Sequence, residues 1–224
     1  MSSRGPRLVL IGKQGAGKGT QSVRVAESFG VMRLATGDLF RTAINEGTEI
    51  GVEAAAFINR GELVPDESVI DLVETHLVLE DRRERGFVLD GFPRTQVQAE
   101  VLDKFLGDFP LDVVVDLDVP TEIVLHRIAG RRVCEDCGAN FHVDNPPKKN
   151  AFCDLCGGEV VQRADDTEDS VMRRLELYEI ETLPVIQHYR RSGALRRVDG
   201  SQESDKVFSD LLDLVKSRFN ARDH

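Results

Sequence analysis

The sequence predicts an α/β fold of three layers, in which helices cover both faces of a five-stranded parallel sheet. Short β-type runs alternate with longer helical patterns along most of the 224 residues, an order typical of parallel strands joined by helices. One run, Val113-Val114-Val115, lacks polar alternation, as a strand buried on both faces should. Two stretches, 37–64 and 130–166, interrupt the alternation and are predicted to be inserts.

The expected elements follow this alternation in order. Strands are expected at 7–11, 31–35, 87–90, 112–117 and 195–198. Helices are expected at about 18–29, 38–46, 66–80, 95–106, 121–129, 167–190 and 204–219. In the helix at 167–190, Val171, Leu175 and Tyr178 share one face, and Pro184 should kink the helix because proline lacks the backbone donor.

Composition limits the function classes. A hydrophobic content of 41% and the chain length allow one large domain or two small ones. The net charge of −10 argues against general binding to nucleic acid or acidic membranes, since both present phosphates. No run approaches the roughly 18 apolar residues of a membrane span, and the apolar run 8–11 is too short for a signal peptide. We therefore expect a cytoplasmic protein whose four cysteines are thiols or metal ligands.

A glycine-rich loop follows the first expected strand and opens a helix: Gly12-Lys13-Gln14-Gly15-Ala16-Gly17-Lys18-Gly19-Thr20. Such a loop lets backbone N–H groups converge on phosphate oxygens at the positive end of the helix dipole, and Lys18 adds a charge for the β- and γ-phosphates. Gly19 stands where a magnesium-binding hydroxyl usually follows the lysine. We therefore expect Mg²⁺ to be held largely by ATP oxygens and water, with Asp90 as an outer-shell anchor and Asp116 and Asp118 as weaker candidates.

The four cysteines form two pairs, Cys134-x2-Cys137 and Cys153-x2-Cys156, separated by fifteen residues. Each pair is followed by a glycine, a spacing that matches tetrahedral four-thiolate zinc sites. A redox function would need only one pair, whereas iron remains an alternative metal because ligand softness alone does not choose. The nearby His142 is expected at the surface, and histidines 76, 126, 188 and 224 show no pattern.

Several motifs, in this order and spacing, resemble the adenylate kinases over nearly the whole chain. They are Gly15-Ala16-Gly17-Lys18-Gly19-Thr20-Gln21, Thr36-Gly37-Asp38, Asp90-Gly91-Phe92-Pro93-Arg94-Thr95 with Gln98, Gly130-Arg131-Arg132, Arg163 with Asp165-Asp166, Arg174, and Val198-Asp199-Gly200. The chain departs from the family at Gln14, where proline is common, and at Ala35, where serine is common. The first departure is expected to loosen the loop and the second to remove one hydroxyl.

The resemblance implies a three-part enzyme. Its core would comprise 1–34, 65–129 and 167–224, while residues 35–64 (the helical insert) clasp the nucleoside monophosphate and residues 130–166 (the cysteine insert) close over ATP. By motif, the ATP contacts would be Gly15, Ala16, Gly17, Lys18, Gly19, Thr20, Arg127, Arg131, Asn140, Phe141 and the backbone of Gln202. The AMP contacts would be Thr36, Arg41, Glu62, Leu63, Val64, Gly91, Phe92, Pro93, Arg94, Gln98, Arg163 and Arg174.

The implied reaction is the reversible transfer of the terminal phosphoryl group of Mg·ATP to AMP, giving two ADP. Phosphoryl transfer needs two polyanions held in line and their charge neutralised, with little covalent work for the protein. The expected catalytic cations are Lys18, Arg94, Arg131, Arg163 and Arg174, with Arg41 beside them; they come from well-separated segments, as a closing clamp requires. Structural Zn²⁺ in the cysteine insert and a monomeric state complete the expectation.

Three other functions compete with this interpretation. Another nucleoside monophosphate kinase, for uridine, cytidine or guanosine, would share most of these motifs, although the amide of Gln98 suits the Watson–Crick edge of adenine. A zinc-ribbon binding module fits poorly because the chain is acidic. A P-loop ATPase or switch protein would not need the second set of arginines around Arg41 and Arg94.

Overall fold

The computed structural model describes residues 4–149 and 151–220. Its central sheet has five parallel strands in the order β2-β3-β1-β4-β8. These are β1 (Arg7–Ile11), β2 (Met32–Ala35), β3 (Phe87–Asp90), β4 (Val113–Asp118) and β8 (Leu195–Asp199). The predicted five-stranded parallel sheet is confirmed, and each strand bound differs from the expected one by no more than one residue.

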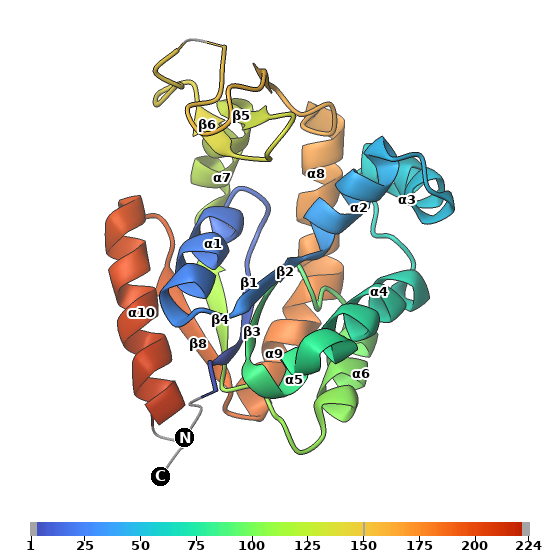
Figure 1. The fold of residues 1–224 in the computed structure, drawn as a ribbon, viewed down its shortest axis with the longest axis vertical. Coiled ribbons are helices and arrows are strands. Elements are labelled where there is room, and N and C mark those ends of the chain that lie inside the picture. Colours follow the sequence, from blue (N-terminus) through green and yellow to red (C-terminus); the bar gives the residue numbers. More distant parts are fainter. Residues whose placement is uncertain (1–3, 150, 221–224) are drawn as a thin grey trace.

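Helices cover both faces of the sheet (Figure 1). Successive residues of β1 enter opposite layers: Leu8 and Leu10 pack in one apolar cluster, and Val9 and Ile11 pack in the other. The first cluster includes residues of α1 (Lys18–Phe29), α7 (Thr121–Ala129), α8 (Glu168–Leu177) and α10 (Ser204–Asn220). The second includes residues of α4 (Asp66–Val78), α6 (Gln96–Leu106) and α9 (Leu183–Arg191). Burial on both faces explains the unbroken apolar runs, and the three-layer fold is confirmed.

The expected helix at 167–190 is interrupted earlier than predicted. α8 ends at Leu177, a π-helical turn spans Tyr178–Thr182, and Pro184 lies in the first turn of α9. A proline in a helix lacks an N–H and crowds the preceding turn. The wider π turn sits directly before that position, so one continuous helix kinked only at Pro184 was the wrong expectation.

The helical insert consists of two short helices, α2 (Thr36–Asn45) and α3 (Glu49–Asn59). Thr48 caps α3 because its hydroxyl accepts from the backbone N–H of Gly51 at 3.2 Å. A Cβ on Gly51 would lie 2.1 Å from the carbonyl oxygen of Ala43, so the helices approach at a distance only glycine allows. A mostly helical block was predicted here. After α4 come a 3₁₀ turn (Leu79–Asp81) and α5 (Arg82–Arg85), so the expected helix 66–80 ends two residues early.

The cysteine insert has its own antiparallel sheet in the order β6-β5-β7. Its strands are β5 (Arg131–Cys134), β6 (Asn140–His142) and β7 (Val160–Val161). Figure 1 shows this insert above α7, at the same end of the molecule as the helical insert. Within the described residues, no helix has the length and apolarity required to cross a bilayer.

Candidate functional site

The glycine-rich loop joins β1 to the first turn of α1. Gly12, Gly15 and Gly17 have φ angles of 149°, 79° and 99°, which side-chain-bearing residues rarely adopt. At Gly15 a Cβ would also lie 2.8 Å from Cγ1 of Ile128. The loop therefore curls tightly against α7 and directs the start of α1, where N–H groups lack intrahelical partners, toward the end of the sheet.

Lys18 is folded back over this loop. Its Nζ donates to the carbonyl oxygens of Gly12 at 2.6 Å and Lys13 at 2.8 Å. Burial lowers the pKa of Lys18 to about 8, with Asp90 opposing the shift and Arg94 and Arg131 adding to it. Lys18 is thus within electrostatic reach of two cations that are far away in the sequence.

The arginines that the sequence singled out lie together. Burial lowers the pKa of Arg94 to about 10, and repulsion from Arg174 and Arg41 contributes. Burial likewise lowers the pKa of Arg163 to about 10, with repulsion from Arg41 and Arg131. Nε of Arg163 is buried and has no hydrogen-bond partner among the described residues. Such a gathering of half-buried cations is unfavourable by itself and favours a polyanion as ligand.

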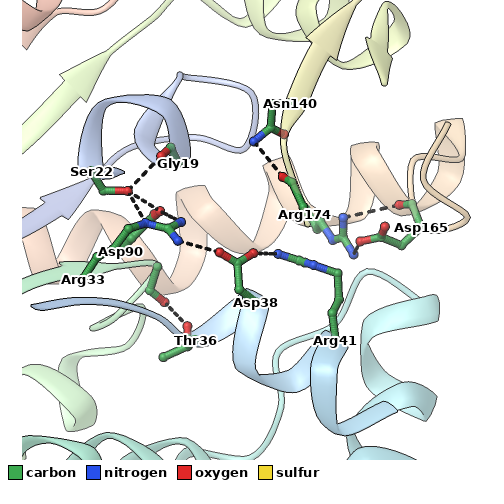
Figure 2. Close-up of polar contacts among 12 residues, drawn as sticks. Gly19, Ser22, Arg33, Thr36, Asp38, Arg41, Asp90, Asn140, Asp165 and Arg174 are labelled. Carbon is green, nitrogen blue, oxygen red and sulfur yellow. Dashed lines mark hydrogen bonds and ion pairs between the residues drawn. The ribbon is translucent and has the colours of Figure 1, made fainter. Parts of the chain in front are cut away.

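We call the six side chains that lie together the cationic cluster: Lys18, Arg41, Arg94, Arg131, Arg163 and Arg174. Three of its arginines are anchored by carboxylates. Arg174 donates to Asp165 at 2.7 Å and to the carbonyl oxygen of Ile58 at 3.0 Å. Nε of Arg131 donates to Asp166 at 2.8 Å. Arg41 pairs with Asp38 (Figure 2). The anchors orient each guanidinium while leaving further donors for a ligand.

Gln14 makes a contact that the motif comparison did not predict. Its Nε2 donates to Asp166 at 3.0 Å, and its Oε1 accepts from Nη1 of Arg174 at 3.1 Å. We expected this departure from the family to loosen the loop. The structure instead shows its amide linking the loop to Asp166, the anchor of Arg131, and to the guanidinium of Arg174.

A second polar network lies between the loop and the helical insert (Figure 2). Asp90 accepts from Nη2 of Arg33 at 2.9 Å, and its Oδ2 lies 2.9 Å from the hydroxyl of Ser22. Arg33 also pairs with Asp38 at 2.7 Å. Burial lowers the pKa of Arg33, but the nearby carboxylates of Asp90 and Asp38 outweigh it and raise that pKa overall. Arg33 and Ser22 were missed by the sequence analysis because neither belongs to a motif.

The weaker magnesium candidates have other partners. Arg197 lies 3.5 Å from Oδ2 of Asp116 and 3.3 Å from Oδ2 of Asp118. Asp116 is buried, and burial raises the pKa of its carboxyl group. Only Asp90 is placed beside the helix start, since a Cβ on Gly19 would be 3.8 Å from its Oδ2.

The residues expected at the monophosphate lie after β2 and β3. Gln98 is buried; its Oε1 accepts from the backbone N–H of Arg94 at 2.7 Å and its Nε2 donates to Asp66 at 2.7 Å. Thr36 donates to the carbonyl oxygen of Gly91 at 3.1 Å. Asp66, which the sequence analysis did not identify, fixes the orientation of the Gln98 amide through its contact with Nε2. Of the other residues expected to contact AMP, Phe92, Pro93 and Val64 are buried and Leu63 is half-buried. Glu62 forms an ion pair with Arg60.

The residues expected around ATP are only partly brought together. Arg127 donates to the carbonyl oxygens of Gly200 at 2.9 Å and Ala16 at 3.4 Å, so it joins the loop to the segment before α10. The side chain of Gln202 bonds to the carbonyl oxygen of Asp199 at 3.0 Å. Asn140 and Phe141 lie on β6, and the amide of Asn140 donates to Gly138 at 3.5 Å. Thr20 is exposed.

The four cysteines converge in the cysteine insert. They are free thiols whose Sγ atoms all lie within 4.8 Å of one another. The Sγ separations are 3.5 Å for Cys134 and Cys156 and 3.6 Å for Cys137 and Cys153. A tetrahedral site with Zn–S bonds of about 2.3 Å places its sulfurs about 3.8 Å apart, so the thiols fit zinc. The glycines behind the two turns, Gly138 and Gly157, have φ angles of 72° and 81° as predicted for such knuckles.

Comparison with known proteins gives a consistent result. The family model described as adenylate kinase matches residues 10–194. The chain is 46% identical over 211 residues to an adenylate kinase of Geobacillus sp. (strain WCH70), covering 93% of this chain and 97% of that protein. It is 46% identical over 207 residues to an adenylate kinase of Methanosarcina acetivorans, covering 91% and 95%. It is 47% identical over 209 residues to an adenylate kinase of Alkaliphilus oremlandii, covering 92% and 96%.

The lowered pKa of Lys18 predicts a pH dependence of polyanion binding. Below about pH 8 the free protein carries the ammonium charge, and above it the charge is lost, so the affinity for inorganic tripolyphosphate should fall as the pH rises through about 8. Calorimetric titration at several pH values measures this. Lys18→Arg, which stays charged, is the control and should lack the decline; equal pH profiles for both proteins would contradict the assignment.

The cysteine geometry predicts that metal holds the insert together. Replacing Cys134 and Cys137 with serine should abolish hydrogen-exchange protection in 130–166 while α1 stays protected, because metal binding supplies folding energy to so small an insert. A strong chelator should bring the parent to the same pattern and leave the double variant unchanged. Retained protection in the variant would show that the thiols are not needed for folding.

Proposed function

The chain belongs to the adenylate kinase family, and from this premise we propose that it transfers the terminal phosphoryl group of Mg·ATP to AMP, giving two ADP. The adenylate kinase family and the relatives named above are phosphotransferases of the nucleoside monophosphate kinase class. The observation that carries the proposed reaction is the cationic cluster. Its six side chains come from α1, α2, the segments after β3 and β7, β5 and α8, and they influence one another electrostatically.

The cluster suits a reaction between two phosphate chains. Lys18 and the N–H groups at the start of α1 would hold the β- and γ-phosphates of ATP, and Arg131 would approach them from the cysteine insert. Arg94 and Arg41 would hold the phosphate of AMP. Arg163 and Arg174 would act on the phosphoryl group in transit. Fixed cations in a site without water stabilise the spread negative charge of the transition state, and no nucleophile from the protein is required.

Magnesium fits this site as a partner of ATP. When bound with ATP, Mg²⁺ would supply positive charge that neutralises part of the phosphate charge. Asp90 is the carboxylate that would orient its water ligands, since it lies beside the start of α1. Arg33 and Ser22 would hold that carboxylate aimed at this position.

Selection of adenine is assigned to Gln98. Each end of its amide already makes one bond, at Arg94 and at Asp66. One N–H and one oxygen lone pair are left. That donor and acceptor pair is what the Watson–Crick edge of adenine requires, and the fixed orientation gives the pocket its selectivity.

The two inserts are proposed to close over the nucleotides. The helical insert would clasp AMP, the cysteine insert would cover ATP, and residues 1–34, 65–129 and 167–224 would form the core. Closure excludes water and completes the cationic cluster, and reopening releases products. Arg127, Gln202, Asn140 and Phe141 would contact the ATP base and ribose side in the closed form.

Zinc is proposed to be structural. Four thiolates saturate a tetrahedral metal and leave no open position for phosphate or water. We also propose a cytoplasmic monomer, because the four thiols are unpaired by disulfides and all proposed site residues come from a single chain.

The base-recognition proposal is tested by a coupled assay with ATP and AMP, CMP, UMP or GMP. The parent should prefer AMP. In Gln98→Ala the kcat/KM for AMP should fall about tenfold to hundredfold, because a buried base edge loses its partner, while the poor substrates change less. Gln96→Ala is the matched control, since Gln96 is exposed and bonds only to Glu100 in the same helix. Equal losses for all monophosphates would remove Gln98 from the base pocket, and no turnover of AMP by the parent would overturn the function.

The bridging position of Gln14 predicts a role in turnover. Gln14→Ala should lower kcat about tenfold, the value of one hydrogen bond to a charged group. Nucleotide KM values should change little, because Arg174 is expected to act in the transition state. Lys13→Ala is the control, since the neighbouring Lys13 donates instead to Thr121 at 3.0 Å. Indistinguishable kcat values for the two variants would show that the bridge has no kinetic role.

A further inference from the structure

A second group of metal-ligating side chains lies outside the phosphate site and the four cysteines. One ligand atom each of His126, His142 and Asp144 lies within 4.8 Å of the other two. The imidazole ring centroids of the two histidines are 5.7 Å apart. Nδ1 of His142 lies 3.1 Å from Oδ2 of Asp144. These three residues belong to none of the functions assigned above.

The hydrogen bonds of the described residues do not satisfy the His142 ring. Nδ1 is 3.2 Å from the backbone N–H of Asp144, which can donate to it. The other nitrogen, Nε2, is buried and has no hydrogen-bond partner among the described residues. In the tautomer that carries the proton on Nε2, the Nε2–H donor has no acceptor. In the tautomer that carries the proton on Nδ1, the backbone N–H of Asp144 loses its acceptor. A half-buried ring with a buried, unsatisfied nitrogen beside two further ligands is expected where protein side chains form an ion site.

The group spans the junction between the core and the cysteine insert. His126 lies in the last turn of α7, and His142 ends β6. Gly130 stands between α7 and β5. The His142 ring packs on that glycine so closely that a Cβ there would lie 2.1 Å from Nε2. An ion bound by both histidines would therefore fasten the end of a core helix to a strand of the insert.

The chemistry of the ligands selects the ion. Two imidazoles and one carboxylate suit Zn²⁺, Ni²⁺ or Cu²⁺, whereas Mg²⁺ prefers oxygen ligands and keeps its waters. Metal–ligand bonds of about 2.0–2.2 Å place neighbouring ligand atoms about 3.0–3.6 Å apart, a spacing that Nδ1 of His142 and Oδ2 of Asp144 already have. His126 and Asp144 are exposed, so their side chains are free to rotate. Water would complete the coordination.

We propose that His126, His142 and Asp144 form a second, regulatory site for a divalent transition metal, whose occupancy ties α7 to the cysteine insert and slows turnover. The effect on turnover rests on the proposed function, because it requires that the insert must move during each cycle. Binding of the metal does not depend on that function.

Binding is tested by calorimetric titration of the zinc-loaded protein with Ni²⁺ in the absence of nucleotide. The parent should bind one equivalent, and His126→Asn and Asp144→Asn should each weaken it at least about tenfold. Both changes are at exposed positions, whereas substitution of His142 would disturb its packing on Gly130. His188→Asn is the matched control, because Nε2 of His188 pairs with Asp103 at 2.7 Å and, among the described residues, the pair belongs to no group of three metal-ligating side chains. Equal Ni²⁺ affinity in the parent and in His126→Asn would overturn the site.

The regulatory effect is tested by steady-state kinetics with excess Mg²⁺ and increasing Ni²⁺. We expect kcat of the parent to fall about fivefold or more and kcat of His126→Asn to stay constant. Nucleotides bind Ni²⁺ equally in both assays, so the difference reports on the protein. An equal response of both enzymes, after His126-dependent binding has been shown, would refute the regulatory effect. Ni²⁺ binding by a parent that does not phosphorylate AMP would instead count against the proposed function alone.

Discussion

The repulsion among the half-buried cations of the candidate phosphate site is the constraint on which the rest of the structure depends. Burial and neighbouring positive groups lower the pKa values of Lys18, Arg94 and Arg163, which makes their charged forms less favourable. At an effective dielectric constant of about 20, two like charges 4 Å apart repel by about 4 kcal/mol. A folded protein can hold such cations close together only if other interactions keep the side chains in place. A bound polyanion then offsets the repulsion among them.

The holding forces can be identified. Asp165, Asp166 and Asp38 each pair with one arginine of the cluster, and Gln14 joins Asp166 and Arg174 to the loop. The cations also come from both inserts as well as from the core. We propose that they separate when the inserts move apart and gather when phosphates bind. We propose that a metal held by the four closely placed thiols stabilises the cysteine insert, whose strands are short, and so positions Arg131.

Much of this arrangement could be predicted from local sequence patterns. The strands β1, β3 and β4 are mostly apolar because both of their faces are covered, and the spacing of the loop glycines is typical of a phosphate-binding turn. Arg33, Ser22 and Asp66 could not be found this way. Their importance comes from partners that are 57, 68 and 32 residues away and are joined only by folding. The same holds for His126 and His142, whose spacing of sixteen positions carries no metal-site signature. The π turn before Pro184 reflects backbone crowding that periodicity does not reveal.

The most direct measurement of the central claim is thermal unfolding of the zinc-loaded parent and of Arg163→Met, each with and without an analogue in which five phosphates join two adenosines. If the buried cations are held for a polyanion, Arg163→Met should unfold at the same or a higher temperature than the parent without ligand, because a buried guanidinium with an unsatisfied Nε has been removed. The analogue should then raise the unfolding temperature of the variant much less than that of the parent. A variant that is less stable without ligand, yet gains as much from the analogue as the parent, would contradict the account.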